Sequence, residues 1–290
     1  MDHHPEAVSK ITVPLILERK LRGEKITCLT AYDYPTARLV DESGIDIILV
    51  GDSLAQVVLG YDSTIPVTVD EIIHHLRAVR RATRRALLVA DLPYGAYHID
   101  DKEALRAAVR YLKEGGAEAV KFEGGRKRAA LIRRMVDAEI PVMGHIGLTP
   151  QSVLALGGYR VQGRTIDSAN ELLADAQAIE DAGAFALVLE GIPRELAALI
   201  TQRCRIPTIG IGAGPECDGQ VLVTHDLIGL GFGPPPKFVR GYADIARTMR
   251  LAFESFRDDV VAKRYPNDHE SYHWPAKMRE QFEKEISHEA

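Results

Sequence analysis

The stretch Asp46-Ile47-Ile48-Leu49-Val50-Gly51-Asp52 is a short apolar run that ends on a carboxylate. Runs of Val, Ile and Leu without polar alternation are typical of parallel strands that are buried on both faces. Four later runs have the same form, and each ends on a polar residue: residues 86–91, 119–123, 141–145 and 186–190. The carboxyl ends of the strands line the active site of an α/β barrel. This one pattern therefore predicts both the fold and the place of the chemistry.

Segments with helical spacing of apolar residues separate these runs, and together they make eight β/α units from residue 25 onward. Two of these segments begin with the form of a capping box, Thr68-Val69-Asp70-Glu71 and Ser168-Ala169-Asn170-Glu171. We expect the seventh strand at 208–212, the eighth at 221–224 and a closing helix at 242–256. The predicted fold class is α/β, a (βα)8 TIM barrel. We divide the chain into an N-terminal extension with a short helix (1–24), a catalytic barrel (25–256) and a C-terminal extension (257–290).

Bulk properties narrow the functional class. A chain of 290 residues suits one barrel with extensions, and its net charge of −5 disfavours binding to nucleic acid. Three cysteines without a close pair indicate a reducing compartment. No signal peptide pattern is found, and no run approaches the roughly 20 apolar residues of a membrane span. We therefore expect a cytoplasmic enzyme with no nucleic-acid or membrane partner.

Three carboxylates, Asp52, Asp91 and Glu123, end the second, third and fourth predicted strands. Adjacent strands lie about 4.8 Å apart, so these side chains can converge. Converging carboxylates repel one another, and a hard divalent cation with oxygen ligands, such as Mg²⁺, removes that repulsion. The alternative is that each acid caps a helix or pairs with Arg or Lys.

Four further residues accompany the carboxylates. Lys121 lies two residues before Glu123, so both share a strand face, and a buried lysine needs an anion. That anion is a metal-site or substrate carboxylate, or Glu123 itself in a structural salt bridge. Ser53 offers a hydroxyl and a backbone N–H to an anion. His145 either donates a hydrogen bond to substrate or is structural. Glu190, the acid left after three metal ligands, is a candidate general base, or else a cap or salt-bridge partner.

Nine motifs, in order from about Lys25 to Tyr265, resemble the ketopantoate hydroxymethyltransferase family. They are Leu29-Thr30-Ala31-Tyr32-Asp33-Tyr34, Val50-Gly51-Asp52-Ser53-Leu54, residues 60–68, Ala90-Asp91-Leu92-Pro93, Val120-Lys121-Phe122-Glu123-Gly124-Gly125, residues 144–151, residues 157–163, Ile209-Gly210-Ile211-Gly212-Ala213-Gly214 and Asp218-Gly219-Gln220. The resemblance implies a barrel of the phosphoenolpyruvate/pyruvate type. It also implies transfer of a hydroxymethyl group from 5,10-methylenetetrahydrofolate to 3-methyl-2-oxobutanoate. The product is 2-dehydropantoate, in the first step of pantothenate biosynthesis.

The resemblance also implies roles for the residues that end the strands. It places one Mg²⁺ per subunit at Asp52, Asp91 and Glu123, and it makes Glu190 the general base. Substrate binding is assigned to Asp52, Ser53, Asp91, Lys121 and His145. Members of the family are commonly homodecamers, so a homo-oligomer is expected.

Two other functions remain open from the sequence. One is a Mg²⁺-dependent lyase or mutase of the same barrel type, which acts on small keto acids and needs no folate. The other is an oligomeric scaffold without catalytic activity. Binding of tetrahydrofolate separates the transferase from the lyase or mutase, and metal binding tests the scaffold.

Overall fold

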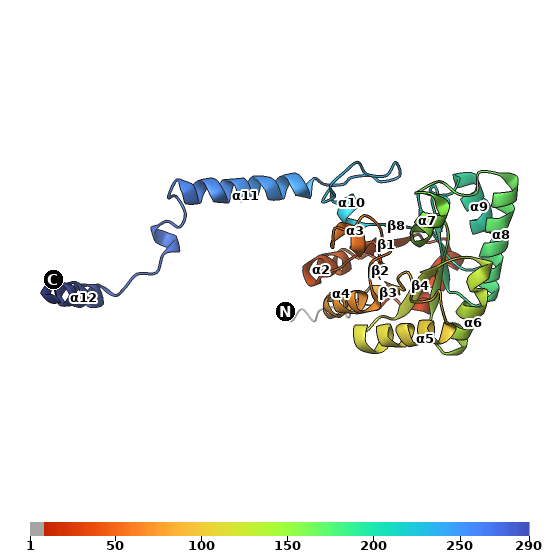
Figure 1. Cartoon of the computed structure of the whole chain (residues 1–290), viewed down its shortest axis with the longest axis horizontal. Coiled ribbons are helices and arrows are strands. Elements are labelled where there is room, and N and C mark those ends of the chain that lie inside the picture. The colour runs from red at the N-terminus through yellow and green to blue at the C-terminus, as the bar shows by residue number, and fades with distance from the viewer. Residues whose placement is uncertain (1–8, 290) are drawn as a thin grey trace, which may run out of the picture. The chain divides into compact units, whose positions relative to one another are not determined.

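Eight parallel strands close into a barrel in the computed structural model, which describes residues 9–289 (Figure 1). Each strand pairs with the next along the chain, and the last pairs with the first in parallel register. The strands are β1 Ile26–Thr30, β2 Ile47–Val50, β3 Leu87–Asp91, β4 Ala119–Glu123, β5 Val142–Gly147, β6 Ala186–Glu190, β7 Thr208–Ile211 and β8 Gly219–Leu222. The predicted α/β barrel is confirmed.

Helices follow the strands and surround the barrel (Figure 1). They are α2 Tyr34–Glu42, α3 Leu54–Val57, α4 Val69–Ala82, α5 Asp101–Arg110, α6 Ala129–Asp137, α7 Val153–Leu156, α8 Ile166–Asp181, α9 Arg194–Arg203 and α10 Thr224–Leu227, with short turns η1 Tyr111–Gly115, η2 Arg126–Arg128 and η3 Pro150–Ser152. The predicted capping box of α4 is confirmed. The Thr68 hydroxyl accepts from the backbone N–H of Glu71 at 3.2 Å, and the Glu71 carboxylate accepts from the N–H of Thr68 at 2.8 Å.

The second predicted capping box, at Ser168-Ala169-Asn170-Glu171, is wrong. Helix α8 begins at Ile166, and its N-cap is Thr165, whose hydroxyl accepts from the N–H of Ser168 at 3.2 Å. Thr165 is itself a favoured N-cap residue. The Ser168 hydroxyl accepts from the N–H of Thr165 at 3.0 Å, which is the role that Glu or Gln usually takes.

The eighth strand begins before its predicted position of 221–224, because β8 starts at Gly219. Gly219 pairs with Ile26 of β1 and with Ile209 of β7. A Cβ atom at this position would overlap the carbonyl oxygen of Ile26, so only glycine permits this close approach. Gly219 is therefore a strand residue where β8 lies between β7 and β1.

The chain divides into two compact units between Tyr242 and Ala243. The second unit contains α11 Ile245–Val261, η4 Asp268–Glu270 and α12 Ala276–Glu289. The helix expected at 242–256 to close the barrel is α11, and it belongs to this second unit. Short α10 follows the last strand in the first unit. Within the described residues, none of the helices combines the length and apolar character needed to cross a lipid bilayer.

The interior of the barrel is a separate apolar cluster from the layer beneath the helices. Ile47 and Leu49 of β2 belong to the interior cluster, whereas Ile48 and Val50 belong to the outer layer, as strand alternation requires. Helix α1, Val13–Arg22, adds Ile16 to the interior cluster. The barrel interior is therefore packed with apolar side chains at its amino-terminal end.

Ile16 tests this packing. The side chain is fully buried (0% exposed), whereas Leu21 on the same helix is 84% exposed. Ile16→Ala is expected to lower the free energy of unfolding by about 2–5 kcal/mol, because it leaves a cavity. Leu21→Ala is the matched control and is expected to change it by less than about 0.5 kcal/mol. Urea denaturation of both variants measures the difference, and equal losses would contradict the packing of α1 into the barrel.

Candidate active site

The polar residues at the strand ends point into the barrel because they are in phase with its interior residues. Ala119 of β4 belongs to the interior cluster, so Lys121 and Glu123, two and four residues later, face the same way. On three other strands, the residue two positions after an interior side chain also faces the interior. These residues are Asp91 on β3, His145 on β5 and Glu190 on β6. One face of each strand thus changes from apolar to polar at its carboxyl end.

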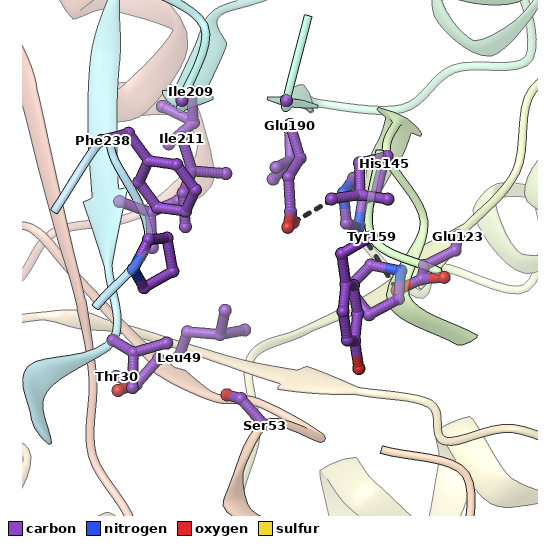
Figure 2. A pocket seen from close by; sticks show the side chains of 18 of the residues that line it. Thr30, Leu49, Ser53, Glu123, His145, Tyr159, Glu190, Ile209, Ile211 and Phe238 are labelled. Atoms are coloured by element: carbon purple, nitrogen blue, oxygen red, sulfur yellow. Dashed lines mark ion pairs between the residues drawn. The ribbon is translucent and has the colours of Figure 1, made fainter. Parts of the chain in front are cut away.

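A cavity of about 870 Å³ opens at this end of the barrel. Its volume is within the range of about 300–1,000 Å³ that is typical of sites for small molecules. The cavity is lined by all seven residues predicted from the sequence: Asp52, Ser53, Asp91, Lys121, Glu123, His145 and Glu190. The structure therefore brings the predicted residues together around one space (Figure 2).

Lys121 forms a buried ion pair with Asp91. The Lys121 Nζ atom lies 2.6 Å from Asp91 Oδ1, and the two residues are directly paired in the register of β3 and β4. Burial alone would lower the pKa of Lys121, but the carboxylates of Asp91 and Asp52 outweigh it and raise that pKa. Lys121 is therefore a fixed positive charge. Its partner is Asp91, one of the three predicted metal-site carboxylates, and not Glu123, the structural alternative.

Asp52 and Glu123 lie on the same floor and are destabilised as anions. Burial, and after it the neighbouring Asp91 carboxylate, raise the pKa of Asp52 to about 7. Burial also raises the pKa of Glu123 well above its usual value, with Asp52 as the next cause. Both carboxyl groups therefore gain from any added positive charge.

His145 lies between two carboxylates. Its Nε2 atom is 3.2 Å from Glu190 Oε2, and its Nδ1 atom is 3.7 Å from Glu123 Oε1 (Figure 2). Burial and the charge of Lys121 lower its pKa, so the imidazole is neutral. Lys121 Nζ, which can only donate, lies 3.4 Å from Nδ1. The ring proton is thus assigned to Nε2, where it faces the Glu190 carboxylate.

Ser53 stands at the start of α3, directly after Asp52. Its Oγ atom lies 2.7 Å from the hydroxyl of Tyr32, which is buried. The Asp52 backbone N–H beside it donates to Asp91 Oδ2 at 3.1 Å. The loop between β2 and α3 is therefore tied to both Tyr32 and Asp91, which fixes the Ser53 hydroxyl at the cavity wall.

Sequence reasoning missed Gln151, which contacts two of the predicted carboxylates. Its Nε2 donates to Asp52 Oδ2 at 2.8 Å, and its backbone N–H donates to Glu123 Oε2 at 3.0 Å. Its Oε1 accepts from the Tyr97 hydroxyl at 2.6 Å, and that hydroxyl accepts from the Glu123 N–H at 3.2 Å. Gln151 lies in a loop after β5, outside any apolar run, so the pattern that marked the strand ends did not mark it.

The floor fits a hard divalent cation by donor type and by charge. Asp52, Asp91 and Glu123 supply oxygen donors, and one lysine does not balance three buried carboxylates. Within the described side chains, no three His, Cys, Asp or Glu groups are arranged to hold a metal ion. Their oxygens are instead directed at Lys121 and Gln151. The carboxylate oxygens are thus oriented toward protein donors, whereas the set of three carboxylates suits Mg²⁺ as a ligand set.

The family described as "Ketopantoate hydroxymethyltransferase" matches residues 10–268 of this chain. The chain belongs to the ketopantoate hydroxymethyltransferase family. A relative from Koribacter versatilis, named "3-methyl-2-oxobutanoate hydroxymethyltransferase", is 62% identical over 95% of this chain and 93% of its own length. A relative of the same name from Trichlorobacter lovleyi is 55% identical over 91% of this chain and 98% of its own length. The family resemblance predicted from the motifs is confirmed.

Solved structures of similar fold come from other members of the barrel class. Phosphonopyruvate hydrolase in complex with oxalate and Mg²⁺ has a TM-score of 0.56 at 14% identity, and covers 95% of this chain and 96% of its own. The lyase that acts on 2,3-dimethylmalate, a PEP mutase/isocitrate lyase superfamily member, has a TM-score of 0.56 at 17% identity, with coverages of 96% and 98%. These likenesses confirm the predicted barrel fold of this ketopantoate hydroxymethyltransferase family member.

The Lys121–Asp91 pair predicts a large energetic coupling. Lys121→Met leaves a buried carboxylate without its cation and is expected to cost about 3–5 kcal/mol of unfolding free energy. Asp91→Asn combined with Lys121→Met is expected to recover part of that loss, because no charge is then stranded. Urea denaturation in EDTA measures the cycle.

The control for this cycle is the exposed i,i+4 pair Arg38–Glu42. Arg38→Met is expected to produce little measurable change, because water screens that pair. Additive effects of the Asp91 and Lys121 substitutions would contradict a coupled buried pair.

The Gln151 contacts predict a shift in one carboxyl group and not in another. Gln151→Met removes the donor to Asp52, so the pKa of Asp52 is expected to rise above its already raised value of about 7. Glu123 accepts from the Gln151 backbone N–H, which methionine keeps. Carboxyl-carbon NMR titration of the metal-free protein measures both groups. Gln177→Met, at an exposed position of α8, is the control. An unchanged pKa of Asp52 in Gln151→Met would refute the assignment.

Proposed function

We propose that this chain transfers a hydroxymethyl group from 5,10-methylenetetrahydrofolate to 3-methyl-2-oxobutanoate, forming 2-dehydropantoate in the first step of pantothenate biosynthesis. The observation that carries the proposal is the cavity floor, where a buried ammonium, buried carboxylates and the Glu190 base line one space. The name that the relatives carry, at 62% and 55% identity over nearly the whole chain, supports the same reaction.

The cavity has two kinds of wall that match the two ends of the keto acid. Lys121 and Ser53 supply a positive charge and a hydroxyl for the carboxylate, and His145 lies beside them. Apolar side chains line other parts of the wall: Leu49, Val188, Ile209 and Ile211 (Figure 2). The branched alkyl group packs on this apolar wall, which turns the reacting carbon toward Glu190.

We assign Asp52, Asp91 and Glu123 to one Mg²⁺ site per subunit. The support is their oxygen donors and uncompensated buried charge, together with a similar fold solved with Mg²⁺ and oxalate. Mg²⁺ held there supplies a Lewis acid for the negative charge that develops on the keto oxygen. Asp52 and Asp91 also position the substrate, because they adjoin Ser53 and Lys121.

Glu190 removes the proton from C3 of the keto acid. Its side chain is 15% exposed, so it reaches the cavity, and His145 Nε2 holds its Oε2 from 3.2 Å away. The C3 carbanion equivalent then forms a carbon–carbon bond to the methylene carbon of the folate, whose bonds to nitrogen break. Water supplies the hydroxyl group of the product, and tetrahydrofolate leaves.

The remaining proposals rest on the family resemblance. We propose that residues 25–256 form the catalytic domain, that residues 257–290 form an extension, and that the subunits assemble into a homodecamer. We also propose a cytoplasmic location. No nucleic acid or membrane takes part in the proposed reaction.

Glu190→Gln tests the proposed base. The variant is expected to lower kcat by about 10²–10⁴-fold with little change in the KM of the keto acid, because binding groups remain and the proton acceptor is lost. NMR of 3-methyl-2-oxobutanoate in D₂O with Mg²⁺ follows loss of the C3 proton signal directly. Glu195→Gln, on the exposed side of α9, is the control. Wild-type rates of exchange in Glu190→Gln would refute the assignment.

A further inference from the structure

The cavity has a mouth whose charge is opposite to that of its floor. We define the mouth by five residues on the loops that follow β5, β6 and β8: Tyr159, Arg160, Arg194, Lys237 and Phe238. Tyr159 is 50% and Phe238 39% exposed, whereas the floor residues are almost completely buried. The mouth is therefore open to solvent and cationic, while the floor is enclosed and rich in carboxylates.

Two of the mouth cations form no ion pair with the described side chains. Arg194 pairs with Glu216. Arg160 and Lys237, in contrast, have no ion-pair partner among the side chains that the structure describes. Asp226 also lines the cavity, and within the described side chains it forms no ion pair with either cation. Arg160 and Lys237 are thus available to an anion that enters from solvent.

The proposed reaction leaves most of the cavity to the second substrate. A cavity of about 870 Å³ is near the upper end of the range for small-molecule sites, and a small branched keto acid fills only its floor. The methylene group of the folate must reach the carbon beside Glu190, so the pteridine end lies deepest. The benzoyl ring and the glutamate tail then extend toward the mouth.

We infer that the mouth binds the glutamate carboxylates of the folate, with Arg160 and Lys237 as the cations that pair with them. This inference rests on the proposed function, because it takes its ligand from that reaction. Tyr159 and Phe238 supply aromatic faces on the path between the floor and these cations (Figure 2). Each added glutamate carries another carboxylate, so the mouth favours folates with several glutamates over those with one.

Arg160→Gln and Lys237→Gln test the inference. Each variant is expected to raise the KM for 5,10-methylenetetrahydrofolate triglutamate by about 2–5-fold, the size expected for a solvent-screened ion pair. The increase is expected to be smaller for the monoglutamate and to shrink at high salt. The KM of the keto acid and the D₂O exchange of its C3 proton are expected to stay unchanged. Arg164→Gln, exposed and outside the cavity lining, is the control.

The outcomes separate this inference from the proposed function. An unchanged KM for the triglutamate in the double variant overturns the inference, as does an equal increase in the KM of both substrates. A loss of D₂O exchange in the variants also overturns it, because the mouth residues would then support the floor. Absence of D₂O exchange in the wild-type enzyme refutes the proposed function instead, and that arm is measured without folate.

Discussion

One buried ammonium group, that of Lys121, makes the rest of the site possible. It lies 2.6 Å from Asp91 in a floor that also holds the buried carboxyl groups of Asp52 and Glu123. The charge of this group lowers the pKa values of both carboxyl groups against the effect of burial, and it lowers the pKa of His145. The floor is therefore a balance of charges in which each protonation state depends on a single lysine.

The barrel supplies that balance with a fixed frame. Alternation along each strand turns the residues at the strand ends inward, and the parallel register sets Asp91 directly beside Lys121. Ile16 fills the opposite end of the barrel interior, and the polar groups that line the cavity lie at the carboxyl end. The same strands carry the apolar interior residues and, at their carboxyl ends, the polar residues of the site. The geometry of the site therefore follows from the geometry of the sheet.

Sequence reasoning found the strand ends because a run of apolar residues marks each of them. It gave Lys121 a metal-site or substrate carboxylate as its anion, with Glu123 as the structural alternative, and the partner is the metal-site candidate Asp91. Which of the three carboxylates pairs with Lys121 is set by cross-strand register, which a sequence does not display. Sequence reasoning missed the contact of Gln151 with Asp52 for a related reason. Gln151 lies in the short turn η3 after β5, where no apolar run or periodic pattern marks a functional residue. The helix at 245–261 shows the same limit, because an apolar stripe predicts a helix but not the unit to which it belongs.

An enclosed floor with one cationic opening also has a kinetic meaning. The interior is packed around Ile16, and the cavity opens at the mouth, so we take the mouth as the entry for both proposed substrates. If the folate tail rests there, a bound folate stands between solvent and the keto-acid site. The keto acid must then bind first and the tetrahydrofolate must leave before the 2-dehydropantoate. The shape of the cavity thus prescribes a compulsory order of binding and release.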